Sequence, residues 1–546
     1  MTNRRSYLLL ALAVFSVGVA MRTLPLYWSP LPFNPDGIHW AALARETVAH
    51  GRVPTDPALI AADEFAFATF FGSVSAVTGV PPLYVAQGMI AILGSVPALL
   101  AIAMVRRIGR VNGWPHRELR IGAFLAGFVL SVEGPFLRRS ATVSSEVAGL
   151  LLVPILAISL DRFIRSRRNL WGLIAALLVA LFPLIHNLST MVAALTATAV
   201  VGIRARDKLS RSWITAGLLV LAFWVYLALY YRTLGLAELS RVSGAPGLFV
   251  GWMIVLVLGL FWITTTTERL QRWVPSAVLG TWIVLFGVNL FIPVFPGTMK
   301  TPPIVLLAVL LFAVPTLVGS LNLHIVTRET RHSPALLALL VGAPTLVFFS
   351  LSAGLTPEYF FTAMRAHMFV HFAVMTLMGV GIVNILRSGP DRSQLRTTLC
   401  VVLCIGMLAT APIAFGGLQT FSYQGTTTTA EFQTASFAAT KIPGTWYSDD
   451  HVTRVTKNHF QNDLLGQPGS IATTKGWLEG TEEAPACTTI GQHSWTTTGA
   501  QLFPAAAQVI KSSTYESWLS ERNVVYRTGS TDPLVVVVSP NRDKSC

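Results

Sequence analysis

Residues 82–110 read PLYVAQGMIAILGSVPALLAIAMVRRIGR, and this stretch decides the class of fold. No charged side chain occurs in residues 82–105, and about 20 apolar residues suffice to cross the hydrocarbon core of a bilayer as a helix. Arginines follow at once at positions 106, 107 and 110. An uncharged run with a basic flank is typical of a membrane helix that ends on the cytoplasmic side.

Similar apolar runs recur along most of the chain, which has 546 residues, 53% of them hydrophobic and 12% charged. A soluble protein would carry about 25% charged residues. The first run follows Arg4 and Arg5 as a signal peptide would, but no small-residue cleavage site follows it, so we interpret it as a retained span. We predict an α-helical membrane protein with about 13 transmembrane helices, near 6–24, 82–105, 121–134, 146–161, 170–186, 188–203, 213–231, 248–266, 275–296, 303–321, 334–353, 367–386 and 397–416.

The distribution of basic residues sets the orientation of this map. With the N-terminus in the cytoplasm, 22 of the 40 lysines and arginines fall in inner segments and 8 in outer loops. Membrane proteins concentrate Lys and Arg in their cytoplasmic loops. We therefore predict an integral cell membrane protein with a cytoplasmic N-terminus. The net charge of +14 reflects this topology and does not indicate a nucleic-acid partner.

The tail after residue 416 has a different character. TWYSDD (445–450) predicts a strand and a turn, SSTYESWLSERN (512–523) a helix, and VVYRTGSTDPLVVVV (524–538) a hairpin. We predict two domains: a transmembrane domain (1–416) with a large first outer loop (25–80), and a small extracytoplasmic α/β domain (417–546). Cys487 and Cys546 are the two cysteines of this tail. They are candidates for a disulfide outside the cytoplasm, and two unpaired thiols are the alternative.

The first outer loop contains NPDGIHWAALARETVAHGRVP (34–54), an acid followed by a helix with mixed faces, as suits a helix lying at the membrane interface. Asp36 lies just outside the first span. Its carboxylate could serve as a general base for an acceptor hydroxyl. The alternative is that Asp36 caps the helix that follows it.

Further charged residues are expected at the outer mouths of spans. Glu146 is the first residue of the fourth span, where it could assist Asp36 or only complement the helix dipole. Glu133, at the outer end of the third span, is the other candidate for this second acid. Arg138 and Arg139 run against the positive-inside trend. Arginine pairs with phosphate through a forked geometry, and contact with lipid headgroups is the alternative.

The stretch PEYFFTAMRAHMFVHF (357–372) adds Arg365 as a third candidate for phosphate binding. His367 and His371 lie one turn apart, but the sequence offers no third ligand for a metal beside them. A hard divalent cation such as Mg²⁺ or Mn²⁺ would prefer oxygen ligands. Asp36 and Glu146, with His39, are the residues expected to hold one. His186, in PLIHNLST, is expected to satisfy a tight outer turn.

The layout resembles the membrane glycosyltransferases of the C superfamily, and its topology is most similar to the catalytic subunit of oligosaccharyltransferase. NPDGIHWAALARETVAHGRVP and DEFAFATFFGSVSAVTGVPPLYVAQ (63–87) resemble the first-loop pattern of that family. RRSATVSSEVAGLLL (138–152) resembles its second-loop acidic motif. That motif carries two acids in the family, whereas Ser144, Ser145 and Glu146 stand here. The family's Trp-Trp-Asp-Tyr-Gly acceptor motif has no counterpart in GWLEG (476–480) or GTWYSDD (444–450).

The resemblance implies an enzyme that transfers a sugar from a polyprenyl-phosphate-linked donor to a protein, lipid or glycan acceptor at the outer membrane face. It implies an inverting displacement assisted by a metal or by arginine, and the missing acceptor motif favours transfer of a single sugar. Two other interpretations stay open: a transporter or channel with helices broken near Pro154, Pro183, Pro315 or Pro344, and a membrane anchor that displays the outer domain.

Overall fold

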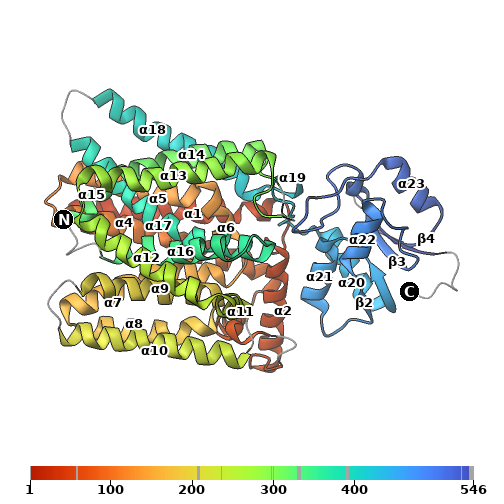
Figure 1. Cartoon of the computed structure of the whole chain (residues 1–546). Coiled ribbons are helices and arrows are strands. Elements are labelled where there is room, and N and C mark those ends of the chain that lie inside the picture. The colour runs from red at the N-terminus through yellow and green to blue at the C-terminus, as the bar shows by residue number, and fades with distance from the viewer. Residues whose placement is uncertain are drawn as a thin grey trace.

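The computed structural model shows a bundle of long helices with a small α/β domain at one end (Figure 1). It describes residues 2–56, 60–205, 210–234, 237–296, 298, 300–328, 334–387, 393–529 and 532–539. We call the end of the bundle that carries the α/β domain the domain end, and the other the opposite end.

The bundle and its first loop consist of these elements: α1 (Thr2–Thr23), η1 (Leu24–Tyr27), α2 (Pro35–His50), η2 (Ala62–Glu64), α3 (Phe65–Thr78), α4 (Pro82–Val111), α5 (His116–Val132), α6 (Gly134–Ala141), α7 (Glu146–Ser166), α8 (Asn169–Leu181), η3 (Phe182–Leu184), α9 (Asn187–Arg204), α10 (Arg211–Leu234), α11 (Ala237–Gly244), α12 (Pro246–Thr265), α13 (Glu268–Phe291), α14 (Pro303–Leu321), α15 (Leu323–Arg328), α16 (Pro334–Ala353), α17 (Pro357–Arg387), α18 (Ser393–Thr410), η5 (Ala411–Phe415) and α19 (Leu418–Phe421).

The predicted membrane-helical class is confirmed, with a lower count of spans. Among the described residues, eleven helices are long and apolar enough to cross a membrane, and α5 with α6 would be a twelfth. Each of the thirteen predicted spans has a helix in its place. Two of these helices are too short to count by themselves: α5, with 17 residues, counts only together with α6, and α8 has 13 residues.

The prolines that a transporter would use to break its helices do not do so here. Pro154, Pro315 and Pro344 lie inside continuous helices, and Pro183 lies in the short η3 turn. Neighbouring helices let membrane spans tolerate such prolines. A sharp bend of 61° occurs instead between α5 and α6, at the domain end.

Helix α17, which carries Arg365, is positioned by a close crossing with α5. A Cβ atom on Gly122 would lie 2.5 Å from the Gly379 carbonyl oxygen, and one on Gly379 would lie 2.6 Å from that of Gly122. Small residues at such crossings let membrane helices approach closely. Close packing matters there because the hydrophobic effect does not drive helices together inside a bilayer. This contact sets the position of α17 relative to α5 and α6.

The domain after residue 428 is a mixed five-stranded sheet of order β2-β1-β3-β5-β4 with helices around it. The fully buried Trp446 and Trp495 lie in its cores. The predicted strand, helix and hairpin are confirmed as β1, α23 and β4–β5, but α21 replaces the predicted turn after β1. Its elements are α20 (Thr429–Lys441), β1 (Gly444–Tyr447), α21 (Asp450–Phe460), β2 (Gly466–Pro468), α22 (Ile471–Leu478), β3 (Thr488–Gln492), η6 (His493–Thr496), α23 (Ser512–Ser520), β4 (Asn523–Arg527) and β5 (Leu534–Val538).

Cys487 is buried in this domain, and its predicted partner Cys546 lies outside the described residues.

Helix α2 lies across the domain end of the bundle, between the spans and the α/β domain (Figure 1). It packs on α4 on one side and on α21 on the other. Its predicted position at the membrane interface stays a prediction.

The orientation predicted from the basic loops can be tested at two exposed serines. Ser166 ends α7 at the opposite end, and Ser470 lies in the α/β domain. In intact cells, a cysteine at Ser470 should react with an impermeant maleimide, and a cysteine at Ser166 should react only after the cells are opened. Equal labelling of both in intact cells would contradict the topology.

Candidate active site

The first turn of α2 carries Asp36, the acid predicted to act as a base. Asn34 is the N-cap of this helix, because its Oδ1 accepts the Asp36 N–H at 3.3 Å, and Pro35 occupies the first helical position. An N-cap side chain satisfies backbone N–H groups that a helix leaves unpaired. The capping role weighed for Asp36 therefore belongs to Asn34, and the Asp36 side chain is 50% exposed.

Asn34 is itself held by the segment that leads into the α/β domain. Its φ of 92° is rare for a residue other than glycine. The Tyr423 hydroxyl donates to Asn34 Oδ1, and the Asn34 N–H donates to the Gly425 carbonyl at 2.6 Å. Burial and the nearby Asp36 carboxylate raise the pKa of Tyr423, so its hydroxyl remains a donor. From α21, Arg454 Nη1 lies 3.8 Å from Asp36 Oδ1.

A second acid, Glu146, is fully buried at the start of α7 and binds two arginines. Arg139 donates from Nε to Oε1 at 2.7 Å, and its Nη2 donates to Oε2. Arg365 donates from Nε to Oε2 at 2.7 Å. The N-terminal end of α7 also favours a negative charge here. Glu146 thus joins α6, α7 and α17 and holds two cations that would otherwise repel each other.

Both arginines still reach the surface of the site. Their side chains are 24% (Arg139) and 29% (Arg365) exposed. In the described part of the chain, no hydrogen bond is found to Nη1 of either. His186 contacts the other face of Arg365, with its Nε2 2.6 Å from Arg365 Nη2. It caps α9 and lies against Ser189, so it supports both a helix start and the arginine.

Arg139 hydrogen-bonds Glu146, and the Asp36 carboxylate is close enough to act on its charge. Asp36, Arg139, Glu146 and Arg365 therefore form one constellation at the domain end.

Arg138 points away from this constellation. Its Nη1 donates to the carbonyls of Ala414 and Gly416, and its guanidinium stacks on Phe421 with 3.8 Å to the ring centroid. Arg138 thereby holds the connection between the last span and the α/β domain.

The residues expected to share a metal do not form a metal-ligand set. His39 lies with Nε2 3.6 Å from Glu64 Oε2 and with its ring against Trp40. Arginines occupy both Glu146 oxygens. Among the described residues, no group of three His, Cys, Asp or Glu side chains could hold a metal ion. The arrangement of Asp36, Glu146 and His39 does not fit a divalent cation.

Glu133, the rival acid, belongs to a separate buried group. Its Oε1 lies 2.5 Å from His371 Nδ1, and His371 Nε2 lies 3.2 Å from His367 Nε2. The three side chains form a line in which each binds the next, rather than converging on a common point. Arg365 and His367 are two residues apart on α17, so they point to different sides of it.

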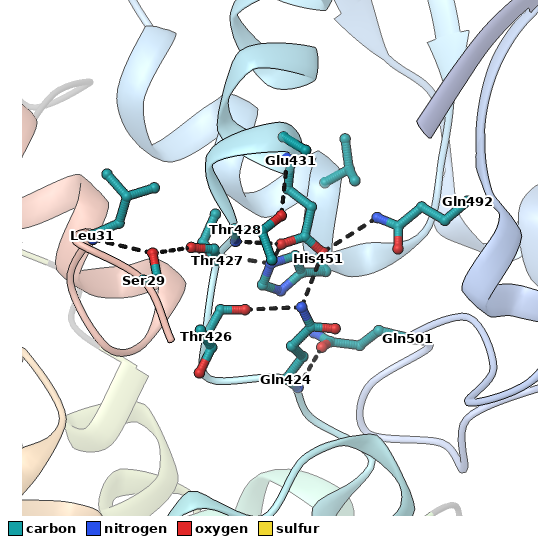
Figure 2. Close-up of polar contacts among 12 residues, drawn as sticks. Ser29, Leu31, Gln424, Thr426, Thr427, Thr428, Glu431, His451, Gln492 and Gln501 are labelled. Carbon is teal, nitrogen blue, oxygen red and sulfur yellow. Dashed lines mark hydrogen bonds and ion pairs between the residues drawn. The ribbon is translucent and has the colours of Figure 1, made fainter. Parts of the chain in front are cut away.

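The α/β domain is joined to the first loop by a polar network around Glu431 (Figure 2). Thr428 and Glu431 form a capping box at the start of α20, and Gln424 Nε2 donates to Glu431 Oε1 at 2.9 Å. His451 Nε2 lies 3.6 Å from Glu431 Oε2. In the same view, the Ser29 hydroxyl of the first loop donates to the Thr427 carbonyl at 2.6 Å. Gln501 links this network to Arg454, because its Oε1 accepts from the Gln424 N–H at 2.7 Å and its Nε2 donates to the Asp450 carboxylate, which Arg454 also binds.

Several residues of the site were not found from the sequence. Asn34 and the Thr428–Glu431 pair carry a local signal, because an Asn before Pro-Asp and a Thr-x-x-Glu spacing are typical of helix starts. Tyr423 and Arg454 carry none, since only the folded chain brings them to Asp36. His186 was expected in a tight turn, and its contact with Arg365 had no signal in the spacing.

No protein-family model and no curated protein matches the sequence. Among solved structures, arabinofuranosyltransferase AftD from mycobacteria is similar at 14% identity and a TM-score of 0.48, over 97% of this chain. The chain spans 41% of the length of that protein.

Two structures of ArnT from Cupriavidus metallidurans are also similar. The one bound to undecaprenyl phosphate shows 15% identity and a TM-score of 0.39, over 98% of both chains. The apo structure shows 12% identity and a TM-score of 0.40, over 99% of this chain and 100% of that one. At this level of similarity, neither an activity nor a residue role is transferred to this chain.

Removing the charge of Glu146 should destabilise the protein. In Glu146→Gln, two partly buried arginines lose their shared counter-ion, and breaking a buried pair typically costs ~3–5 kcal/mol. Thermal unfolding of the purified protein should show a large drop in Tm. Glu268→Gln removes an exposed partner of Arg272, so it should change stability by less than about 1 kcal/mol. Similar Tm values for the two variants would contradict the structural role of Glu146.

Stability should also depend on pH through His451. Burial alone would lower its pKa, but Glu431, Asp449 and Asp450 together raise it above the usual value. A histidine whose pKa is higher in the folded state than in the unfolded state stabilises the fold when it is protonated. Its full contribution is present below the unfolded-state pKa of about 6.5, and it is lost as the pH rises through the folded-state pKa. The Tm of the wild type should therefore fall more between about pH 6 and about pH 9 than that of His451→Gln. His493→Gln, which changes an exposed histidine, is the control and should keep the wild-type slope.

Proposed function

We propose that this chain is a membrane glycosyltransferase that moves a sugar from a polyprenyl-phosphate-linked donor to a protein, lipid or glycan acceptor. One observation carries the proposal. Two partly exposed arginines, Arg139 and Arg365, are fixed by the buried Glu146 at the mouths of membrane spans, in one constellation with the exposed carboxylate of Asp36. We place the reaction at the extracytoplasmic face, where the basic loops put the domain end.

The location suits a donor that is carried by a lipid. A polyprenyl chain lies in the bilayer, and its phosphate lies at the interface, level with the ends of the spans. The Nη1 groups of Arg139 and Arg365 bind neither Glu146 nor His186. They can therefore donate hydrogen bonds to phosphate oxygens. Arginine binds phosphate through paired, charge-assisted hydrogen bonds. Arg138 adds a third positive charge close by, although carbonyl oxygens hold its guanidinium.

The reaction that these groups support is a single displacement with inversion. The acceptor hydroxyl oxygen attacks the anomeric carbon and forms the new glycosidic bond. The bond between that carbon and the phosphate oxygen breaks, and its electron pair leaves with the polyprenyl phosphate. Asp36 takes the hydroxyl proton as general base, while Arg139 and Arg365 stabilise the charge that grows on the phosphate. No metal enters this scheme.

Glu146 acts through the arginines and is therefore a positioning residue. Both of its oxygens are engaged and its side chain is fully buried, so it has no free access to an acceptor. Tyr423 and Arg454 position Asp36 in the same way, through Asn34 and through the 3.8 Å ion pair. The α/β domain thus completes the site rather than only being displayed by the bundle.

The test separates chemistry from binding. Asp36→Asn keeps the shape of the side chain and leaves the Asn34 cap intact, and loss of a general base costs a factor of about 100 to 10,000 in rate. Transfer from a panel of polyprenyl-phosphate sugars should fall by that factor, while binding of polyprenyl phosphate itself stays near the wild-type level. Arg365→Gln should weaken that binding.

Asp463→Asn, at an exposed aspartate of the α/β domain, is the matched control and should transfer normally. If a folded Asp36→Asn protein transfers sugar at the wild-type rate, Asp36 is not the base. If no polyprenyl phosphate binds to the wild type, the proposed donor is wrong.

A further inference from the structure

A groove of about 560 Å³ lies between α1, α5 and α18, away from the proposed site. Its lining residues lie in the N-terminal halves of α1 and α5, at the opposite end of the bundle, where Figure 1 shows the N-terminus, and in the middle of α18. Helix α5 runs from this groove to the bend before α6, and its 17 residues span about 25 Å. The groove is therefore distinct from the constellation around Glu146.

The lining of the groove changes from basic to apolar along its length. On α5, the residues Arg117, Arg120, Ile121 and Phe124 line it. Their spacing of three and four residues places them on one face of the helix, with the arginines in the first two turns and the apolar side chains farther along. Cys400, Val401, Cys404 and Ile405 of α18, with Leu10 of α1, form the opposite walls.

Positive charge accumulates at the basic end of this groove. Arg117 and Arg120 lie near the N-terminus of α5, where the helix dipole already disfavours cations. No ion pair with a carboxylate is found for either of them in the described ranges. Arg106 and Arg110 lie close by, since they and Arg120 all act on Tyr7. Arg106 stacks on the Tyr7 ring, so Arg117 and Arg120 are the two arginines that line the groove, and their positive charge favours an anionic ligand.

We propose that this groove binds an anionic phospholipid. Its phosphate would lie between Arg117 and Arg120, and one acyl chain would run along Phe124, Cys404 and Ile405. Basic pockets between membrane helices at the cytoplasmic side are suited to anionic headgroups. A free phosphate would leave the apolar length empty, and a zwitterionic headgroup would bring its ammonium group to the same arginines. This site is independent of the proposed transfer reaction.

The experiment uses the purified full chain in detergent, titrated with phosphatidylglycerol or with phosphatidylcholine of the same acyl chains. Phosphatidylglycerol should raise the Tm by at least about 2 °C, because a ligand that binds only the folded state stabilises it. It should also slow alkylation by N-ethylmaleimide of Cys400 and Cys404, which line the groove. Phosphatidylcholine should do neither.

A charge-matched pair of variants tests the headgroup site. Arg117→Gln with Arg120→Gln should abolish the shift in Tm. Arg165→Gln with Arg168→Gln removes the same charge from exposed residues at the same end and should keep the shift. An equal loss in both variants would mean a general charge effect and would overturn the site. An equal shift with inorganic phosphate, or unchanged alkylation of the wild type, would overturn the phospholipid as its occupant.

Discussion

A fully buried carboxylate, that of Glu146, keeps two arginines side by side at the mouth of the bundle. In a medium of low polarity, two such cations repel strongly, and a shared anion offsets this only with good hydrogen-bond geometry. Arg139 comes from α6 and Arg365 from α17. The ion cluster therefore also fixes three helix ends relative to each other, and the bend after α5 is what turns α6 toward it.

The other half of the site is built from two segments that lie far apart in the sequence. The first loop supplies Asp36, but the groups that place it, Tyr423 and Arg454, follow the last span. The network around Glu431 adds a second contact between the loop and the α/β domain, at Ser29. In the proposed reaction, the bundle supplies the positive charge, and the contact between loop and domain positions Asp36 as the base.

The membrane-helical class and the small α/β domain were predictable, because uncharged runs and short β-branched segments are strong local patterns. Asp36, Arg139, Glu146 and Arg365 were also singled out, since charges at span mouths are rare. Their partners were not predictable. The contact of Arg139 with Glu146 depends on the 61° bend before α6, and no spacing in the sequence encodes that angle.

The length of chain between Asn34 and Tyr423 has a consequence for biosynthesis. The hydrogen bond between their side chains joins residues 389 positions apart. While the nascent chain is being inserted, α2 can form, but the Asn34 backbone has no partner to hold its left-handed conformation. The cluster of arginines and Glu146 is complete as soon as α17 is inserted. The hydrogen bond from Tyr423 to Asn34 forms only after the last span has been made, so this half of the proposed site is completed after the cluster of arginines and Glu146.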